Sequence, residues 1–305
     1  MQIFDTIKKT EYDTSVALGF FDGVHKGHQD VIRKAVAASS DACPATVVTF
    51  KNSPAAATGK NKPLLTTNEQ KFELFKKLGV KVVFCIDFND VKDMSAQEFV
   101  HDVLYQTLNA KCVVTGFNYH FSKGGKATAD DMQKLCEPLG IDAIKCAPVM
   151  YNNEPVSSTR IRRCISDGDI ESANDMLGYN FSIDNLIVSG NHLGTTLSSP
   201  TINQKLDKDI VTPRFGVYAT KVTVNDTTYI GATNIGVHPT VGKVSAVCET
   251  HLLDFFGESL YNKRACTKLL KFIRAERKFE SIDELKAQIE KDKKAIIRYF
   301  DEQSL

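Results

Sequence analysis

The residues best suited to chemistry near the N-terminus form the run Gly19-Phe-Phe-Asp-Gly23-Val-His25-Lys-Gly27-His28. The run follows a β-rich segment and precedes a helical pattern, which is the position where α/β sheets bind ligands. Gly23 and Gly27 let the backbone approach a ligand, and the free N–H groups at a helix start favour an anion. His25 and His28 are three residues apart, so both imidazoles are expected to project the same way and donate hydrogen bonds to phosphate oxygens. The run therefore predicts a phosphate site.

Two other interpretations of this run stay open. A metal site would rest on only two histidines, and histidines with a purely structural role would leave the flanking glycines unexplained. Two nucleotide-binding loops are excluded by the residues. No GxGxxG fingerprint is present, and a Walker A loop at Gly124-Gly125-Lys126 fails because His120 and Ala127 occupy its end positions.

A second polar segment, Gly116-Phe-Asn118-Tyr-His-Phe-Ser-Lys-Gly-Gly125, also follows a predicted strand. An asparagine, a lysine and two glycines after a strand suit a loop that faces phosphate. An ordinary solvated loop has the same composition, so this alternative also stays open.

A third segment, Val156-Ser-Ser158-Thr159-Arg-Ile-Arg162, predicts the start of a helix. Ser158 and Thr159 can cap that helix and also present hydroxyl and N–H groups to phosphate. Arg162 lies four residues beyond Ser158, one turn along the same face, where a guanidinium can clamp a triphosphate in bidentate fashion. Capping alone accounts for the serine and the threonine, but it leaves the arginine unexplained.

The segments around these motifs predict the element order of the first part of the chain. Helical spacing of apolar residues alternates there with β-rich runs, which indicates a parallel sheet covered on both faces. Two short helices should follow, one from Ser158 and one over Asp169–Leu177, ended by Gly178. The expected strands are Ser15–Phe20, Ala45–Phe50, Val80–Ile86, Lys111–Gly116 and Ile141–Ala147.

From Phe181 onward the pattern changes to short β-rich segments separated by turn residues. Such spacing predicts a small antiparallel barrel or sandwich, with Asn225-Asp226 as a hairpin turn. A terminal helix of about 19 residues, capped by Ser281, should present one apolar stripe. We place the boundary near Ser182, so that the domains cover residues 1–182 and 183–305. The expected stripe is Ile282, Leu285, Ile289, Ile296, Ile297 and Phe300.

Length and composition fit this division. The 305 residues allow two domains, and 42% hydrophobic with 25% charged residues is typical of globular proteins. A net charge of +1 gives no global field for nucleic acid or an acidic membrane. No apolar run is long enough to span a bilayer, and the N-terminus lacks the apolar core of a secretory signal. The eight cysteines show no CxxC spacing, so free thiols in a cytoplasmic protein are expected.

The first-domain motifs together resemble a known family. The HxGH run from His25 to His28 is similar to the signature of nucleotidyltransferases, and Phe21–Gln29 resembles the adenylyltransferase half of bacterial bifunctional riboflavin kinase/FAD synthetases. The segments from Gly116 and Val156 match that family's glycine-bounded segment and SSTxIR motif. The resemblance implies a Rossmann-like nucleotidyltransferase domain that adenylylates FMN. It implies catalytic roles for His25, His28, Ser158, Thr159 and Arg162, and nucleotide contacts from Gly19, Phe21, Asp22, Gly23, Gly27, Gly116 and Asn118.

The second domain resembles the riboflavin kinase half of the same family. The run from Gly190 to Asn203 is similar to the flavokinase motif that ends in Pro-Thr-Ala-Asn, and Phe215–Ala219 and Glu249–Phe255 follow in family order. The resemblance implies that Glu249 is the general base for the riboflavin 5′-hydroxyl, although a glutamate at a strand start is also often solvated or ion-paired. It further implies Mg²⁺ held by Thr201 and Asn203, nucleotide contacts from Gly190 and Gly194, and flavin contacts from Arg274 and Glu276.

The sequence departs from the family pattern at three places. Phe20 stands where the family has Asn, Lys51–Pro54 replaces Pro-His-Pro, and Ser198-Ser199 replaces Gly-Phe. We therefore expect a bifunctional enzyme with ATP, riboflavin, FMN and FAD as its small-molecule partners. The alternatives are a monofunctional FMN adenylyltransferase with a degenerate flavin-binding barrel, or a regulator that binds flavin or nucleotide without turnover.

Overall fold

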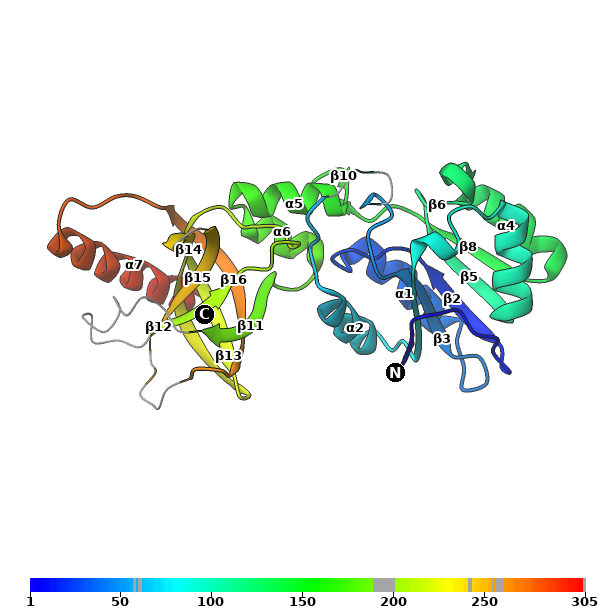
Figure 1. Cartoon of the computed structure of the whole chain (residues 1–305), viewed down its shortest axis with the longest axis horizontal. Coiled ribbons are helices and arrows are strands. Elements are labelled where there is room, and N and C mark those ends of the chain that lie inside the picture. Colours follow the sequence, from blue (N-terminus) through cyan, green and yellow to red (C-terminus); the bar gives the residue numbers. More distant parts are fainter. Residues whose placement is uncertain are drawn as a thin grey trace. The chain divides into compact units, whose positions relative to one another are not determined.

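A computed structural model describes residues 1–56, 59, 62–188, 201–240, 243–253, 255 and 260–303. The chain divides into two compact units, Met1–Ser158 and Thr159–Leu305 (Figure 1). Gly190, Gly194 and Ser198-Ser199 lie outside the described residues.

The first unit is built on a six-stranded parallel sheet with strand order β1-β4-β3-β2-β5-β8. The predicted alternation of strands and helices is confirmed. The sequence analysis missed β1, because three partly exposed residues at an edge carry no periodic pattern. The strands are β1 (Gln2–Phe4), β2 (Thr14–Leu18), β3 (Ala45–Phe50), β4 (Val82–Ile86), β5 (Ala110–Gly116) and β8 (Asp142–Cys146).

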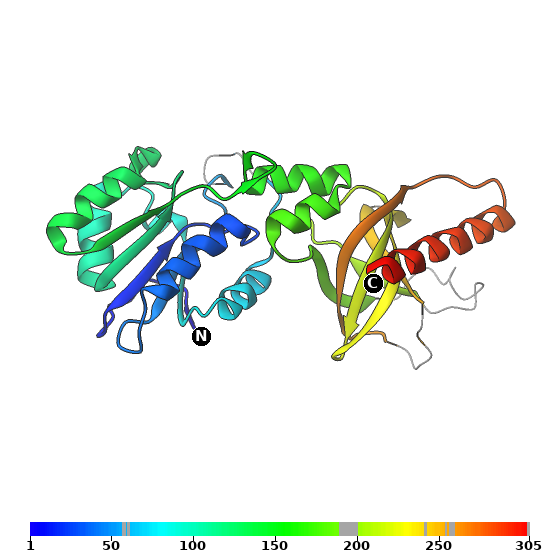
Figure 2. The same cartoon turned by 180° about the vertical axis from the view of Figure 1, so that it is seen from behind.

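Helices cover both faces of this sheet, as the two opposite views show (Figure 2). Val16 and Leu18 of β2 face a core that includes Leu104 and Met132, whereas Ala17 faces the core of α1 and α2. The strand is buried on both sides, which explains its unbroken apolar sequence. The helices are α1 (Lys26–Ala37), α2 (Asn68–Lys77), η2 (Phe88–Asp90), α3 (Ala96–Glu98), the π-helix η3 (Phe99–Thr107), η4 (Lys123–Gly125), α4 (Ala129–Cys136) and η5 (Glu137–Leu139).

The strand order places a topological switch point at the end of β2. From β2 the chain passes through α1 to β3 on one side, and later returns to β5 on the other side of β2. Ligands of open α/β sheets bind at the carboxyl ends of the strands at such a point. The histidine run follows β2, and the segment with Asn118 follows β5, so the sheet brings the starts of both motifs to this edge. Two hairpins complete the unit: β6 (His120–Phe121) with β7 (Ala127–Thr128), and β9 (Met150–Tyr151) with β10 (Glu154–Pro155).

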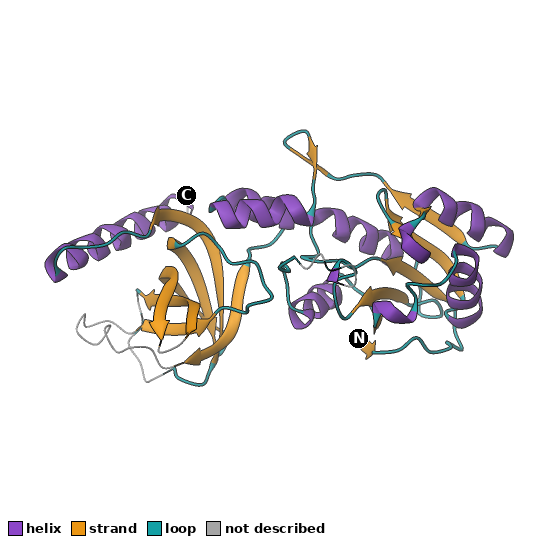
Figure 3. Ribbon diagram, turned by 45° about the horizontal axis from the view of Figure 1, so that its top comes forward, coloured by secondary structure: helices purple, strands orange, loops and turns teal. Residues whose placement is uncertain are grey.

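The second unit contains a closed antiparallel barrel with strand order β11-β12-β15-β14-β13-β16 (Figure 3). This confirms the prediction of a small barrel with a terminal helix. The Asn225-Asp226 turn is also confirmed, because both residues adopt the positive φ of a hairpin turn, 47° and 64°. The strands are β11 (Ser182–Val188), β12 (Thr201–Lys205), β13 (Gly216–Val224), β14 (Thr227–Thr240), β15 (Lys243–Leu252) and β16 (Arg264–Ala275).

Helices α5 (Ser158–Asp167) and α6 (Ile170–Leu177) lie where the sequence predicts them, and Gly178 ends α6 in a left-handed conformation. Helix α6 is bound to the barrel, because Nδ2 of Asn174 donates to the Leu269 carbonyl at 2.9 Å. The Asn174 Oδ1 also accepts the N–H of Phe181 at 2.7 Å. Both bonds lie within the second unit, which begins at Thr159. Whether an independently folding domain begins near Ser182 stays a prediction.

Helix α7 (Ile282–Gln303) is capped by Ser281, whose Oγ accepts the N–H of Glu284 at 3.1 Å. The prediction of one apolar stripe is wrong for two residues. Ile296 is fully buried, but Ile282 is 71% exposed and Ile297 is 47% exposed. A polar contact partly replaces the expected apolar one: Asp292 is buried against the barrel residue Arg274.

Candidate active sites

In the first unit, His25 is the N-cap of α1, and its Nδ1 accepts the backbone N–H of His28 at 3.3 Å. The two imidazoles stack, with ring centroids 3.6 Å apart and an interplanar angle of 17°. A Cβ on Gly27 would come within 3.2 Å of the His25 ring, so glycine leaves room for this stack. The sequence prediction that both rings project the same way is confirmed.

Both histidines are neutral at neutral pH. Burial lowers the pKa of His25 to about 4. Burial also holds the pKa of His28 well below its ordinary value, and the nearby His25 and Lys71 lower it further. Because Nδ1 of His25 accepts a hydrogen bond, the proton of the neutral ring lies on Nε2, which makes Nε2 a donor. Neutral imidazoles can therefore present N–H groups to phosphate without carrying a charge themselves.

The loop that carries the histidines is tied to a distant segment. The Asp22 carboxylate accepts the N–H of Leu65 at 2.8 Å, and the N–H of Gly23 donates to Thr66 Oγ1 at 3.2 Å. Gly23 has a φ of +77°, a conformation that favours glycine. Phe21 is buried and packs edge-on against the His28 ring, with centroids 5.4 Å apart. Asp22 and Phe21, predicted as nucleotide contacts, thus also hold the loop in shape.

The other predicted residues of this site lie on three elements. Asn118 is exposed just beyond β5, next to Gly116, and its carbonyl oxygen is 2.9 Å from Nδ1 of His120. Ser158 begins α5, and its Oγ donates to the Asp22 carbonyl at 2.9 Å, which brings the helix start to the histidine loop. Thr159 and Arg162 follow on α5 in the second unit, so their part in this site stays a prediction.

Sequence reasoning missed Lys71, which is 3% exposed on α2. Its Nζ is 3.4 Å from each of three oxygens, the carbonyls of Phe20 and Phe50 and the hydroxyl of Thr49. Lys71 lies four residues before the buried Phe75, on the face that the helix turns toward the core. The sequence does contain a signal, because Lys71 occupies a position on the apolar face of α2. Lys76 and Lys77 on the same helix made it look like an ordinary surface lysine.

In the second unit, strand register brings the predicted kinase residues into one row. Glu249 on β15 lies directly opposite Asn203 on β12 and opposite Asn234 on β14. Thr201 lies opposite His251, two residues along the same strands. Cys248 and Thr250 are fully buried in the barrel, so the alternation of a strand places Glu249 on the outer surface. Oxygen donors of Thr201, Asn203 and Glu249 therefore share one face.

The two predicted flavin residues differ in their surroundings. Glu276 Oε1 accepts a hydrogen bond from Asn234 Nδ2 at 3.3 Å, which links it to the row with Glu249. Arg274 is instead bound by α7, because its Nε and Nη2 both donate to the buried Asp292 carboxylate at 2.7–3.1 Å. Gln288 adds a bond to the same carboxylate at 2.8 Å. The Arg274 guanidinium thus fixes the terminal helix to the barrel.

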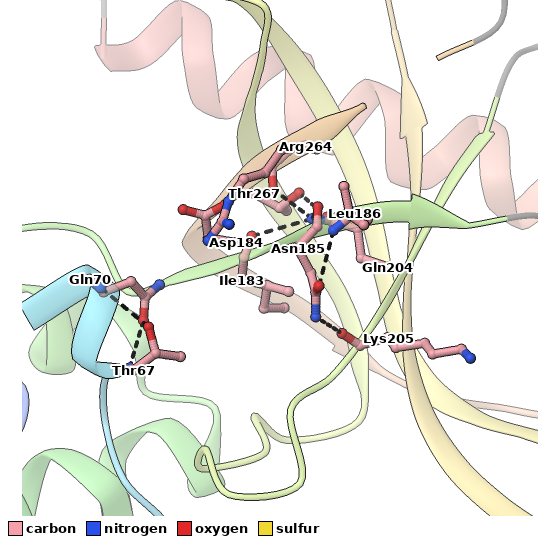
Figure 4. Close-up of polar contacts among 11 residues, drawn as sticks. Thr67, Gln70, Ile183, Asp184, Asn185, Leu186, Gln204, Lys205, Arg264 and Thr267 are labelled. Carbon is pink, nitrogen blue, oxygen red and sulfur yellow. Dashed lines mark hydrogen bonds and ion pairs between the residues drawn. The ribbon is translucent and has the colours of Figure 1, made fainter. Parts of the chain in front are cut away.

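A buried polar network stiffens the barrel wall behind these residues (Figure 4). The Gln204 side-chain amide donates to the carbonyls of Ala265 at 2.7 Å and Asn185 at 3.1 Å. Its oxygen accepts the Thr267 hydroxyl at 2.6 Å. Gln204 is fully buried next to Asn203, and its bonds cross β11 and β16, so it fixes the register of β12. Figure 4 also shows the capping box of Thr67 and Gln70 that begins α2.

Among the described residues, no group of three or more His, Cys, Asp or Glu side chains is placed to hold a metal ion. All eight cysteines are free thiols. No helix in the described ranges is both long and apolar enough to cross a bilayer.

Comparison with known proteins matches both units. The FAD synthetase family model matches residues 7–160, and the riboflavin kinase family model matches residues 177–300. The bifunctional riboflavin kinase/FMN adenylyltransferase of Listeria monocytogenes is 35% identical over 95% of this chain and 94% of that relative. The protein of the same description from Escherichia coli K12 is 32% identical over 93% of this chain and 92% of its own length.

A solved structure also matches the whole chain. It is described as a macrolide-efflux protein from Streptococcus pneumoniae, with a TM-score of 0.88 and 30% sequence identity. The match covers 97% of this chain and 99% of the solved one. Two units of these types, in this order, are therefore found together in another solved protein.

Proposed function

The chain belongs to the bifunctional riboflavin kinase/FMN adenylyltransferase family, and from this premise we propose how its two sites divide the work. The barrel unit transfers the γ-phosphoryl group of ATP to riboflavin and gives FMN. The sheet unit joins FMN to the AMP part of a second ATP and gives FAD and pyrophosphate. The observation that supports this division is that His25, His28 and Asn118 follow β2 and β5 of the first unit, whereas Asn203, Glu249 and Asn234 lie on β12, β15 and β14 of the second.

For adenylylation, we propose that the protein positions reactants rather than supplying a nucleophile. An FMN phosphate oxygen attacks the α-phosphorus of ATP, a new P–O bond forms, and pyrophosphate leaves with the electrons of the broken bond. The neutral imidazoles of His25 and His28 donate hydrogen bonds to phosphate oxygens as charge builds up. Further proposed contacts come from residues at the ends of β2 and β5 and at the start of α5: Gly19, Phe21, Asp22, Gly23, Gly27, Gly116, Asn118, Ser158, Thr159 and Arg162.

For phosphorylation, we propose that Glu249 accepts the proton of the riboflavin 5′-hydroxyl while that oxygen bonds to the γ-phosphorus and ADP leaves. Its position on the outer face of the barrel, flanked by Asn203 and Asn234, supports this role. Glu276 and Arg274 are the proposed flavin contacts. Glu276 is linked to the row by its bond from Asn234, whereas Arg274 would act together with α7.

Magnesium fits the donor set of the barrel site. Thr201 and Asn203 offer hydroxyl and amide oxygens beside the Glu249 carboxylate, and hard oxygen ligands are those that Mg²⁺ prefers next to phosphate. When bound, Mg²⁺ neutralises charge on the ATP phosphates. The proposed nucleotide contacts Gly190 and Gly194 complete the motif.

The proposed small-molecule partners are ATP, riboflavin, FMN and FAD. Eight free thiols support a reducing compartment, and we propose that the protein works in the cytoplasm. The near-zero net charge supports the absence of nucleic acid among its partners.

The proposal is tested by incubating the purified protein with ATP and magnesium and separating the flavins by chromatography. FAD formed from riboflavin requires both activities. FAD formed only from added FMN would reduce the function to adenylylation, and no conversion of either flavin would contradict catalysis.

The domain boundary is tested with two fragments. A fragment of residues 183–305 should fold and bind riboflavin if the barrel is self-sufficient. A fragment of residues 159–305 retains α5 and α6, and with them the Asn174 bond to Leu269. If only the longer fragment folds, the proposed boundary at 182 is misplaced and these helices belong to the barrel domain.

A further inference from the structure

Lys71 is a buried charge that the proposed chemistry does not yet use. Its ammonium contacts residues at the carboxyl ends of β2 and β3, where the carbonyls of Phe20 and Phe50 and the Thr49 hydroxyl are its acceptors. The Thr49 hydroxyl itself donates to the Phe20 carbonyl at 3.0 Å. Nζ also lies 4.9 Å from the centroid of the Phe20 ring. The lysine is therefore held by three hydrogen bonds and one aromatic face, in a fixed position.

None of these partners carries a negative charge. The described part of the chain gives Lys71 no carboxylate within ion-pair distance, although the charges of Asp22 and Cys85 act on it from farther away. A buried cation without a counter-ion is costly, and proteins rarely keep one unless an anion completes the site. The uncompensated charge of Lys71 therefore points to an anion that binds at this site.

A second observation at the same loop points to a ligand. Nδ1 of His28 is buried and has no hydrogen-bond partner among the described residues. The charge of Lys71 acts on this histidine and favours its neutral form. Among the described residues, the site therefore holds a buried imidazole nitrogen without a hydrogen-bond partner and a buried cation without a counter-ion. An anion can accept a hydrogen bond from the imidazole and balance the charge of the ammonium.

We propose that Lys71 is a positioning residue of the adenylylation site, whose charge attracts the phosphate groups bound at the loop that carries His25 and His28. Lys71 acts in two ways. Its positive charge attracts anions to the end of β2, and its hydrogen bond to the Phe20 carbonyl fixes the start of the loop that carries the histidines. The ligand class is a polyphosphate, either the triphosphate of ATP or the pyrophosphate product. The inference rests on the proposed function of the first unit and adds a residue to it.

The charge of Lys71 should depend on pH. Burial lowers its pKa to about 8, so the side chain is charged at pH 7 and largely neutral at pH 9.5. The titratable groups facing it are Asp22 on the loop after β2, His28 on α1 and Cys85 on β4. His28 is already neutral at pH 7, because burial holds its pKa well below its ordinary value, so it does not change charge between the two pH values. Cys85 has its pKa raised by burial, which delays its ionisation.

The test measures the affinity of the full chain for pyrophosphate by calorimetry at pH 7 and pH 9.5. Three variants are compared with the wild type. Lys71→Met removes the charge, Lys71→Arg keeps a charge at both pH values, and Lys76→Met removes an exposed charge from the same helix as a control. The ionisation of pyrophosphate is common to all four proteins, so it cancels in their ratios.

We expect Lys71→Met to bind pyrophosphate at pH 7 at least ~10-fold more weakly than the wild type, which is the size of one partly screened charge pair. At pH 9.5 this difference should largely vanish. Lys71→Arg should bind more tightly than the wild type at pH 9.5, and Lys76→Met should match the wild type at both values. Equal affinity of Lys71→Met and wild type at pH 7, or one ratio at both pH values, would overturn the inference.

Two further measurements separate this inference from its premises. Urea unfolding of Lys71→Met, followed by circular dichroism, shows whether the first unit of the variant is folded, because riboflavin phosphorylation reports on the barrel alone. If that variant fails to fold, the pH dependence of Lys71→Arg against the wild type still decides. If the wild type does not adenylylate FMN at all, the proposed function fails; if it does so and Lys71→Met is equally active, only the role of Lys71 fails.

Discussion

The two sites are built in different ways. In the first unit the functional groups sit on a loop and a helix start, where Phe21, Gly23 and Val24 all have positive φ and hydrogen bonds from elsewhere hold the backbone in place. In the second unit the groups stand on three neighbouring strands, and ladder register alone brings Asn203, Glu249 and Asn234 together. The loop site offers backbone N–H groups to phosphate, whereas the strand site offers side-chain oxygens to a metal and a hydroxyl.

This contrast should be visible in single substitutions. In the proposed barrel site, proton transfer is assigned to one residue, Glu249, so its loss should be costly. In the proposed site of the first unit, several hydrogen-bond donors share the stabilisation of the phosphate groups, so the loss of one donor should lower the rate less.

The largest effect is expected for Glu249→Gln. The change keeps the shape but removes the proton acceptor, so riboflavin phosphorylation should fall by about 10³-fold. Adenylylation of supplied FMN should be unchanged. Both rates are measured by flavin chromatography, with the exposed Glu302→Gln as the control. Brisk phosphorylation by Glu249→Gln would show that another group is the base.

Ser198-Ser199 qualifies that expectation. If these residues hold the wild-type kinase inactive, Glu249→Gln would change little. The double change Ser198→Gly with Ser199→Phe should then raise phosphorylation in the chain that keeps Glu249. A weak wild type that the double change does not improve would contradict this explanation.

A smaller effect is expected for His28→Ala. Loss of one neutral N–H donor from the loop site should lower FMN adenylylation by about 10²-fold. Phosphorylation of riboflavin should stay normal, because the residue belongs to the other unit. His101→Ala removes an exposed histidine of the first unit and serves as the control. Near-normal FAD production by His28→Ala would remove the histidine pair from the proposed mechanism.

The buried histidines should also make the first unit sensitive to acid. The folded state holds the pKa of His25 at about 4, below its ordinary 6.5, so the unfolded state binds protons first as the pH falls. Stability is therefore complete above pH 6.5 and is lost between pH 6.5 and pH 4, by about 3 kcal/mol for this residue. Urea unfolding followed by circular dichroism measures the loss.

The matched variant for the acid experiment is His25→Asn. Asparagine is a good N-cap, and its side-chain oxygen can accept the His28 N–H in place of Nδ1 without titrating. The variant should lose less stability than the wild type between pH 6.5 and pH 4. An equal loss in both proteins would mean that His25 does not titrate as its burial requires.

Much of the fold follows from the sequence, because buried parallel strands and amphipathic helices leave long, repeated patterns. The edge strand β1 is too short for such a pattern. At the sites, residue types and motif order predicted His25, His28 and Glu249, whose positions the fold makes plausible. Lys71 and Gln204 were missed because a buried polar residue is recognised only by its partners, and the bonds of Gln204 span up to 63 residues of sequence.

The smallest effect tests whether the loop site stores strain. Ser122 lies in the segment Gly116–Gly125 that carries Asn118, and it has φ 68° and ψ 175°, a region that only glycine adopts easily. Such a conformation costs a non-glycine residue about 1–3 kcal/mol of folding free energy, which glycine would recover. Glycine in turn destabilises the folded state by about 0.5–1 kcal/mol, because it loses more conformational entropy on folding. Ser122→Gly should therefore stabilise the first unit by about 1 kcal/mol and raise its Tm by roughly 2–4 °C.

Ser40→Gly is the matched control, since Ser40 is not among the residues with positive φ. It gains no relief of strain and should lose up to about 1 kcal/mol. Thermal unfolding by calorimetry compares both variants with the wild type. If Ser122→Gly raises the free energy of unfolding and Ser40→Gly lowers it, the loop around Ser122 is held in a strained conformation. The barrel site needs no such strain, because strand pairing alone positions its residues. A loss of stability in both variants would mean that Ser122 carries no strain, and the contrast between the two sites would then rest on their donor groups only.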